Sequence, residues 1–260
     1  MTPKRFLSVI AVMLAAVMWL SCTSDSPTST TQPNQIPDLS QTPRENREAE
    51  MAAAFLSGQV VAPQNLYERV LGDLQKIREE YGDSLPVRNI GFRPHWIASA
   101  ISARIDSVTL ADSTSGARRM LDSLNALYRC ISATKPYTWW EFEFQGVLNP
   151  LALTKIYSDV PGMEVICPSI NGLGDWSLFG LSSPKRGEIH YFFRYGFGDC
   201  PAGCIYSRVY YFCTTYRNVT YHGFYPHNIQ HPEATPEWFE AAQDALKTVM
   251  YPDCWSADSI

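Results

Sequence analysis

Residues 189–197 read IHYFFRYGF, and large hydrophobic side chains occupy every second position of this stretch. Side chains two residues apart lie on the same face of an extended chain, so the spacing predicts a β-strand with one largely aromatic face. The alternating positions are Ile189, Tyr191, Phe193, Tyr195 and Phe197.

The residues that follow predict an antiparallel β-meander closed by a helix. Residues 198–204, GDCPAGC, are rich in turn formers, and further strands are expected over 205–214 and 219–224. Thr235 and Pro236 predict the start of a C-terminal helix, because apolar residues recur after them at helical spacing. Those apolar residues are Trp238, Ala242, Ala245, Leu246 and Val249.

Residues 95–171 show a second pattern, which a loop rich in Gly, Ser and Pro over 172–186 separates from the meander. The expected elements are a strand over 95–105, a helix over 117–128, strands over 129–133 and 140–144, a helix over 149–160 and a strand over 163–167. Ile97, Ile101 and Ile105 would also fit a helix, but β-branched residues favour a strand. This order is that of the βαββαβ unit of ferredoxin-like folds. The predicted fold class is α+β, with a ferredoxin-like unit followed by a C-terminal antiparallel β-meander and helix.

Composition and charge restrict the class of protein further. The chain has 260 residues, of which 45% are hydrophobic and 18% charged, so it can bury a core and is not disordered throughout. Its formal net charge of −5 argues against a nucleic-acid partner, because phosphate backbones attract basic surfaces. Residues 44–94 predict a helical segment, with helices over 45–56 and 65–81. We expect residues 172–260 to pack with the preceding unit as one domain.

Residues 1–22 have the features of an export signal. A basic start precedes an apolar run from residue 6 to residue 21, which is shorter than the roughly 20 residues of a membrane span. The run ends in WLSC at 19–22, which resembles the lipobox of bacterial lipoproteins, although Trp19 stands where that motif usually has Leu. The resemblance implies that Cys22 is lipidated and becomes the new N-terminus. The alternative is an ordinary signal peptide that ends near a cysteine.

Residues 23–43 predict a disordered tether between the lipid anchor and the folded part. Ser, Thr and Pro fill 13 of these 21 positions, so the segment cannot bury enough apolar surface to offset the entropy lost on ordering. Thr23 follows Cys22, whereas lipoproteins retained in the inner membrane often have Asp there. The resemblance therefore implies a lipid-anchored protein of the bacterial cell envelope, at the outer membrane.

Residues 144–171 contain FQG at 144–146, PGMEV at 161–165 and PSIN at 168–171. These motifs resemble the end of a subtilisin-type propeptide, a family with a ferredoxin-like fold. The resemblance extends over residues 95–171 and implies an alternative function as a propeptide-like protease inhibitor. Cys167-Pro168-Ser169 stands where those propeptides often carry an acidic triplet, and nothing after it resembles a Ser-His-Asp enzyme.

A second resemblance rests on two motifs, LNALY at 124–128 and the GDCPAGC hairpin at 198–204. The hairpin, the aromatic strand after it and the LNALY helix end are similar to those of a group of uncharacterised secreted bacterial proteins. This resemblance covers most of residues 95–215 and implies no activity.

The six cysteines other than Cys22 predict disulfides, because an exported protein reaches an oxidising compartment. The expected pairs are Cys200 with Cys204, Cys213 with Cys254, and Cys130 with Cys167. The last pair follows by subtraction alone. In a ferredoxin-like sheet its two strands lie at opposite edges, too far apart for a bond that needs Cα atoms within about 7 Å.

Two chemical sites compete with this interpretation. A zinc site would use Cys200, Cys204, His222 and His227. A catalytic site would use Cys200 as a nucleophile and His190 as its base. The neighbouring Asp199 carboxylate would raise the pKa of the Cys200 thiol, which argues against this site. We expect no catalysis, no metal and no cofactor.

The strand aromatics have two interpretations. They form the core of the meander, or some of them form an exposed surface that binds a ligand or partner. The candidate binding surface consists of Phe192, Tyr206, Tyr210 and Phe212.

Together these features predict a non-catalytic, membrane-anchored extracytoplasmic lipoprotein with a binding or structural role. Its expected partners are the membrane, through the lipid anchor, and a protein or small ligand. The alternatives are a propeptide-like protease inhibitor and a hydrolase of unknown type.

Overall fold

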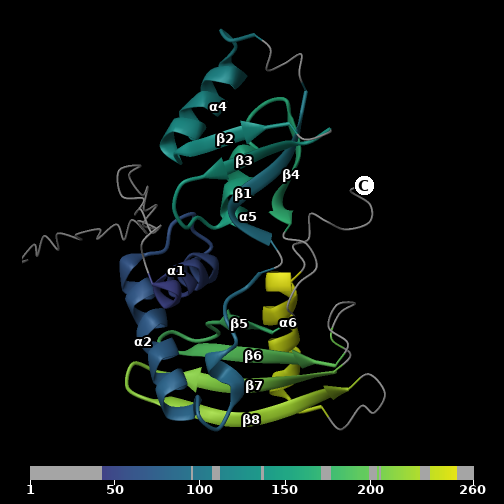
Figure 1. Ribbon diagram of the computed structural model, residues 1–260. Helices are drawn as coiled ribbons and strands as arrows, with labels where there is room; N and C mark the ends of the chain where they lie inside the picture. The colour runs from purple at the N-terminus through teal and green to yellow at the C-terminus, as the bar shows by residue number, and fades with distance from the viewer. Residues whose placement is uncertain are drawn as a thin grey trace, which may run out of the picture. The chain divides into compact units, whose positions relative to one another are not determined.

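A computed structural model describes residues 43–94, 96–106, 112–135, 138–170, 177–198, 204, 206–228 and 235–250. These residues form helices and two antiparallel four-stranded sheets (Figure 1), so the predicted α+β class is confirmed. The predicted signal sequence, Cys22 and nearly all of the predicted tether lie outside the described residues.

The helices and strands have the following bounds. The helices are α1 (Arg44–Ser57), α2 (Gln64–Tyr81), the 3-10 helix η2 (Pro86–Arg88), α4 (Gly116–Leu127), α5 (Pro150–Tyr157) and α6 (Trp238–Met250). The strands are β1 (Trp96–Ile105), β2 (Cys130–Thr134), β3 (Trp140–Phe144), β4 (Met163–Ile170), β5 (Leu178–Ser182), β6 (Ile189–Phe197), β7 (Tyr206–Thr214) and β8 (Val219–Asn228).

The first sheet has the strand order β2-β3-β1-β4, and all of its neighbouring strands are antiparallel. Helix α4 follows β1 and α5 follows β3, so the order of elements predicted for residues 95–171 is confirmed. Side chains of both helices and of the central strands share one hydrophobic core. It includes Ile101, Ala103, Leu121, Phe142, Phe144, Leu153 and Tyr157.

Side-chain caps begin both helices of this region. Asn149 accepts a hydrogen bond from the backbone N–H of Leu151, with Pro150 in the first turn, as the sequence predicts. Ser115 caps α4 by accepting from the N–H of Arg118. Asn149 also joins this region to the chain around α1. Its Nδ2 donates to the Ala54 carbonyl at 3.1 Å, and its backbone N–H donates to Val60 at 2.9 Å.

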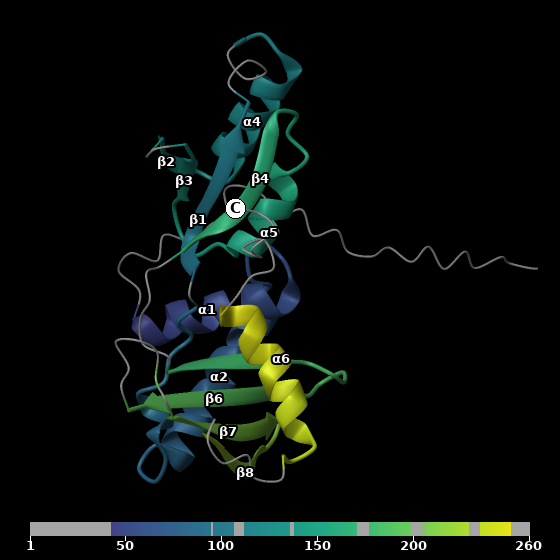
Figure 2. The same cartoon turned by 90° about the vertical axis from the view of Figure 1, so that its right-hand side faces the viewer.

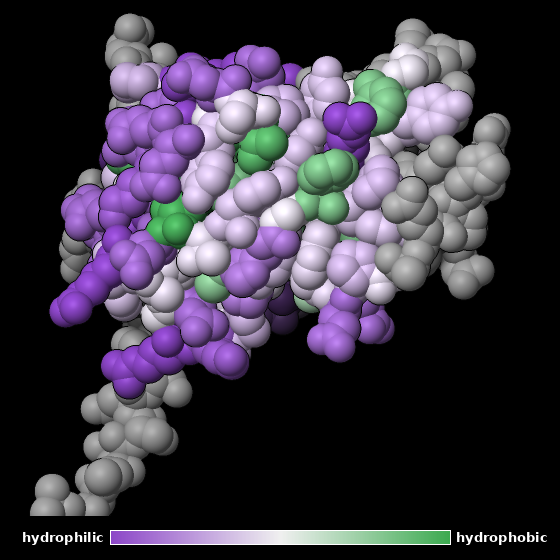
Figure 3. Space-filling model, turned by 90° about the horizontal axis from the view of Figure 1, so that it is seen from below, coloured by the Kyte–Doolittle hydropathy of each residue, from purple (hydrophilic) through white to green (hydrophobic). Residues whose placement is uncertain are grey.

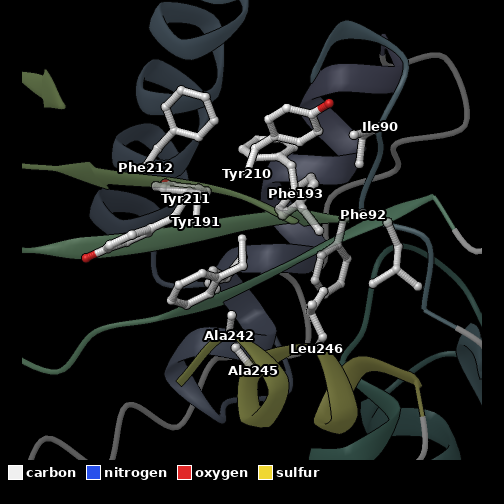
Figure 4. Close-up of a cluster of buried hydrophobic side chains, with 14 of the residues drawn as sticks. Ile90, Phe92, Tyr191, Phe193, Tyr210, Tyr211, Phe212, Ala242, Ala245 and Leu246 are labelled. Atoms are coloured by element: carbon white, nitrogen blue, oxygen red, sulfur yellow. The ribbon is translucent and has the colours of Figure 1, made fainter. Parts of the chain in front are cut away.

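The second sheet has the order β5-β6-β7-β8, and helices cover both of its faces. Helix α6 lies on one face and α2 on the other, as Figure 1 and Figure 2 show. On the α2 side, Tyr81 packs against Phe212 with ring centroids 5.1 Å apart. On the α6 side, Trp238 stacks on Phe192 at 6.5 Å. Figure 4 shows Tyr210 and Phe212 on the side of the strands away from α6.

Strand β5 is an addition to the predicted meander, because residues 172–186 were expected to form a loop. Its sequence is LFGLS, and the first four residues are buried. A run that is buried on both faces lacks the polar alternation that marks a half-buried strand, and Gly and Ser made it resemble a loop.

A buried polar network attaches α2 to the second sheet. Asp73 Oδ2 accepts hydrogen bonds from Arg69 Nε at 2.8 Å, Thr214 Oγ1 at 2.6 Å and Tyr191 OH at 3.2 Å. Burial, followed by the charge of Asp73, raises the pKa of Tyr191 well above its ordinary value, so the phenol stays a donor. The buried carboxylate is therefore compensated by a cation and two hydroxyl groups.

Gly180 allows α6 to lie directly on β5. A Cβ atom at this position would lie 2.8 Å from the backbone carbonyl of Ala245. Real side chains do not make such contacts with backbone, so the helix would have to move. The close packing of α6 therefore depends on the absence of a side chain at Gly180.

We expect Gly180→Ala to lower the free energy of unfolding by about 2–3 kcal/mol, because the added methyl group forces α6 away from the sheet. Gly72→Ala is the matched control. Gly72 lies within α2, and an added Cβ there meets nothing within 4 Å. That change should stabilise the chain by about 0.5–1 kcal/mol. Urea unfolding of both variants measures the difference, and equal effects would contradict the account of Gly180.

Candidate functional site

A hollow with a volume of about 460 Å³ lies between α6 and the sheet face that α6 covers. Its apolar wall consists of Val209 from β7 and Phe239, Leu246 and Met250 from α6. Ligand sites for small organic molecules have volumes in this range and combine an apolar wall with a few polar groups.

The strand register explains why this space remains. Residues opposite one another on antiparallel strands point to the same face, and the face repeats every second residue. On the α6 side the opposite pairs are His190 with Cys213, Phe192 with Tyr211, Arg194 with Val209, and Gly196 with Ser207. Trp238 covers the aromatic pair. Gly196 and Ser207 have little side-chain volume, so space is left beside α6 at that end of the strands.

Ser207 gives the hollow a buried polar group. The residue is 2% exposed, and its Oγ has no hydrogen-bond partner among the described residues. A buried hydroxyl without a partner costs about 1–3 kcal/mol, and such a group in a folded protein calls for an explanation. A molecule that enters the hollow could supply the missing hydrogen bond.

Charged side chains also line the hollow. Arg194 and Lys247 contribute two cations and Asp244 one anion, with Gln243 beside them. The excess of positive charge favours a ligand that carries an anionic group next to an apolar part.

Few large hydrophobic side chains are exposed in the described part of the chain. Figure 3 shows one face on which the few strongly hydrophobic groups are separate from one another. The exposed large hydrophobic residues in the described part of the chain are Met120, Ile131, Tyr195, Tyr216 and Phe224. Single exposed hydrophobic residues are normal on a protein surface. Tyr195 and Phe224 are not single, because Tyr195 stacks on Phe197, Phe197 stacks on Tyr206, and the Arg208 guanidinium lies over the rings of both Phe197 and Phe224.

A second group of reactive side chains lies at the other end of the same strand pairs. His190 and Cys213 are directly opposite in the register of β6 and β7, and Glu188 precedes His190 by two residues. One ligand atom from each of these three residues lies within 4.8 Å of the other two. Glu188 Oε2 is 3.7 Å from His190 Nε2, and the Tyr211 hydroxyl is 3.2 Å from His190 Nδ1.

The ionisation of this group argues against a cysteine nucleophile. Burial, followed by the Glu188 charge, raises the pKa of the Cys213 thiol, so the thiol stays protonated at neutral pH. Burial lowers the pKa of His190 despite the opposing effect of Glu188, so the imidazole is neutral there. A neutral thiol beside a neutral imidazole is not the activated pair that nucleophilic catalysis needs.

The proposed aromatic binding surface is wrong for three of its four residues. Phe192 and Phe212 are fully buried and Tyr210 is 4% exposed, while Tyr206 is half-buried. Phe192 also lies on the α6 side, opposite to the face that holds Tyr210 and Phe212. Both faces of the sheet are covered, so these aromatic side chains form core rather than surface.

The predicted disulfides have different outcomes. Cys130 and Cys167 are not joined by a disulfide, and the pair predicted between them is wrong because β2 and β4 are the two edge strands of the first sheet. Cys213 is a free thiol, and its predicted partner Cys254 lies outside the described residues. Cys204 is not among the free thiols, and its predicted partner Cys200 lies outside the described residues. The Cys200–Cys204 pair stays a prediction.

The alternative zinc site is wrong as a single site. Cys204 precedes Tyr206, the first residue of β7, whereas His222 stacks on Tyr211 with ring centroids 4.6 Å apart. Tyr206 and Tyr211 are roughly 17 Å apart along a strand, so one ion cannot bind both Cys204 and His222. Cys200 and the side chain of His227 lie outside the described residues.

No protein-family model, curated protein or solved structure matches this chain. In the part of the chain that the structure describes, none of the helices combines the length and hydrophobicity needed to span a membrane.

Neither the hollow nor the His190 group on the α6 side of the second sheet was predicted from the sequence. His190 was considered as a base for Cys200, but β6 and β7 place it opposite Cys213. A hairpin centred on the predicted turn at 198–204 would place His190 opposite Phe212, one residue away from its observed partner Cys213. Ser207 and Arg194 gave no signal in the sequence, because the hollow depends on where α6 crosses the sheet.

Proposed function

We propose that this chain is a non-catalytic, lipid-anchored protein of the bacterial cell envelope whose folded part binds a small anionic molecule with an apolar portion. The observation that carries the binding role is the buried hydroxyl of Ser207 in the wall of the hollow, which has no hydrogen-bond partner in the part of the chain that the structure describes. The lipobox-like residues 19–22 and the polar segment 23–43 support the anchor.

We also propose that residues 95–171 form a ferredoxin-like unit. The strand order β2-β3-β1-β4 and the helix after each of β1 and β3 support it. The alternative role as a propeptide-like protease inhibitor has less support. An inhibitor of this type would engage a protease cleft with an edge strand or with the segment after Val165. Cys167, Pro168 and Ser169 of that segment are buried within β4, which leaves the edge strands β2 and β4 of the first sheet as the contact.

The anchor is tested by processing in cells. Globomycin inhibits the signal peptidase of lipoproteins, so we expect it to cause the unprocessed precursor to accumulate. We expect Cys22→Ser to move the chain out of the membrane fraction. Normal processing in the presence of globomycin would contradict the anchor.

The binding role is tested with phenylbutyrate, which joins a carboxylate to an apolar ring, and with phenylbutanol, which lacks the charge. We expect the full-length chain to bind the acid ~10-fold more tightly than the alcohol, because a hydrogen bond to a charged group contributes about 1.5–3 kcal/mol and a neutral one about 0.5–1.5 kcal/mol. Isothermal titration calorimetry measures both affinities.

Two variants and one control connect this binding to the hollow. Ser207→Ala should weaken phenylbutyrate binding ~10-fold while leaving the free chain equally or more stable, because the described residues offer its hydroxyl no hydrogen-bond partner. Lys247→Glu should weaken binding further by reversing a charge. Lys76→Glu, on the exposed side of α2, is the matched control and should change nothing. Equal binding of acid and alcohol, or no effect of Ser207→Ala, would refute the proposal.

A further inference from the structure

Three side chains of different chemistry converge at the end of the strand pairs opposite to the hollow. Cys213 offers a thiol, His190 an imidazole and Glu188 a carboxylate, with one ligand atom of each within 4.8 Å of the others. These groups are three of the common protein ligands of zinc. His190 and Cys213 reach this position because they are cross-strand partners, and Glu188 because it lies on the same face two residues earlier.

The spacing of these atoms is close to what one ion requires. Zinc bonds of about 2.0–2.3 Å in a tetrahedron place ligand atoms roughly 3.3–3.8 Å apart. The separation of Glu188 Oε2 from His190 Nε2 is already 3.7 Å. The three ligand atoms, which lie within 4.8 Å of one another, would have to approach by about 1 Å at most to share one ion.

Tyr211 orients the imidazole in the way that a metal site needs. Its hydroxyl is 3.2 Å from His190 Nδ1, which leaves Nε2 directed toward Glu188. Histidine ligands of metals commonly hold their second ring nitrogen in a hydrogen bond of this kind. Tyr211 itself is held between His222, at 4.6 Å, and Trp238, at 5.3 Å. Rings on two sides of Tyr211 therefore restrict the positions that its hydroxyl can take.

The site is shielded but reachable. The side chain of His190 is 18% exposed and that of Glu188 is 34% exposed, and Cys213 is half-buried. An ion can enter from solvent. The surrounding aromatic rings limit the access of water, which would compete with the protein ligands for the ion.

We propose that Glu188, His190 and Cys213 form a binding site for one Zn²⁺ ion, with Tyr211 as a positioning residue. Zn²⁺ would bind the thiolate of Cys213, and the thiol proton would pass to solvent. Three protein ligands leave the fourth position of the tetrahedron open to water or to a ligand. This site shares no residue with the hollow, so the two proposals can fail separately.

The test uses the full-length chain under reducing conditions, with Co²⁺ as a spectroscopic probe and Zn²⁺ to displace it. We expect one Co²⁺ per chain, with a thiolate-to-cobalt charge-transfer band and the intense visible bands of tetrahedral cobalt. Tyr211→Phe should weaken Zn²⁺ binding ~10-fold, as loss of a supporting hydrogen bond does. Cys213→Ser should abolish the charge-transfer band.

Controls separate loss of the site from loss of the fold. Cys130→Ser changes a half-buried free thiol on β2 and should leave the spectrum unchanged. Glu188→Gln keeps the size of the side chain and should weaken Zn²⁺ binding by at least ~10-fold even if Cys213→Ser does not fold. Absence of the charge-transfer band in the parent chain, or its persistence in folded Cys213→Ser, would overturn the proposal.

The oxidation state of Cys213 in the exported protein provides a second test of the zinc site. Peptide mass spectrometry of the chain from the cell envelope, without reduction, shows whether Cys213 is a thiol. We expect a thiol that zinc protects from alkylation. A disulfide between Cys213 and Cys254 would remove a ligand and overturn the zinc site in the native protein.

Discussion

The consecutive buried aromatic residues of β6 and β7 require the second sheet to be covered on both faces. Tyr191, Phe192 and Phe193 point alternately to opposite faces, yet all three are fully buried. Each such side chain contributes roughly 2–3 kcal/mol when it is removed from water, so neither face can remain open. α2 covers one face and α6 the other, although a separate sheet lies between them in the sequence.

The two candidate sites are consequences of how α6 covers its face. Trp238 packs over the central aromatic pair, Phe192 and Tyr211. Toward Gly196 and Ser207 the strands carry small or charged side chains next to this pair, which do not fill the space beneath α6. The hollow, with the Ser207 hydroxyl in its wall, lies there. In the other direction, His190 and Cys213 lie beside Glu188. The register of two strands therefore places an organic ligand site and a metal site on one face, at opposite ends.

Local patterns predicted most of the elements but not their partners. The alternation of residues 140–144 correctly predicted β3, and Asn149-Pro150 correctly predicted the start of α5. Both signals depend only on residues that are close in sequence. The same alternation in 189–197 concealed the burial of Phe192, since coverage of the second face depends on α6, more than 40 residues later. β5 was missed for a similar reason. The sites could not be predicted, because they arise where distant elements cross.

The central claim is that α6 and the sheet form one cooperative unit, with the aromatic strands buried beneath it. Native-state amide hydrogen exchange on the full-length chain tests this directly. The account predicts that the amides of β6, β7 and α6 exchange only through global unfolding, with one shared free energy that equals the value from denaturant unfolding. Exchange from α6 at a free energy ~3 kcal/mol or more below that of β6 would contradict it, because α6 would then open while the aromatic strands stayed folded.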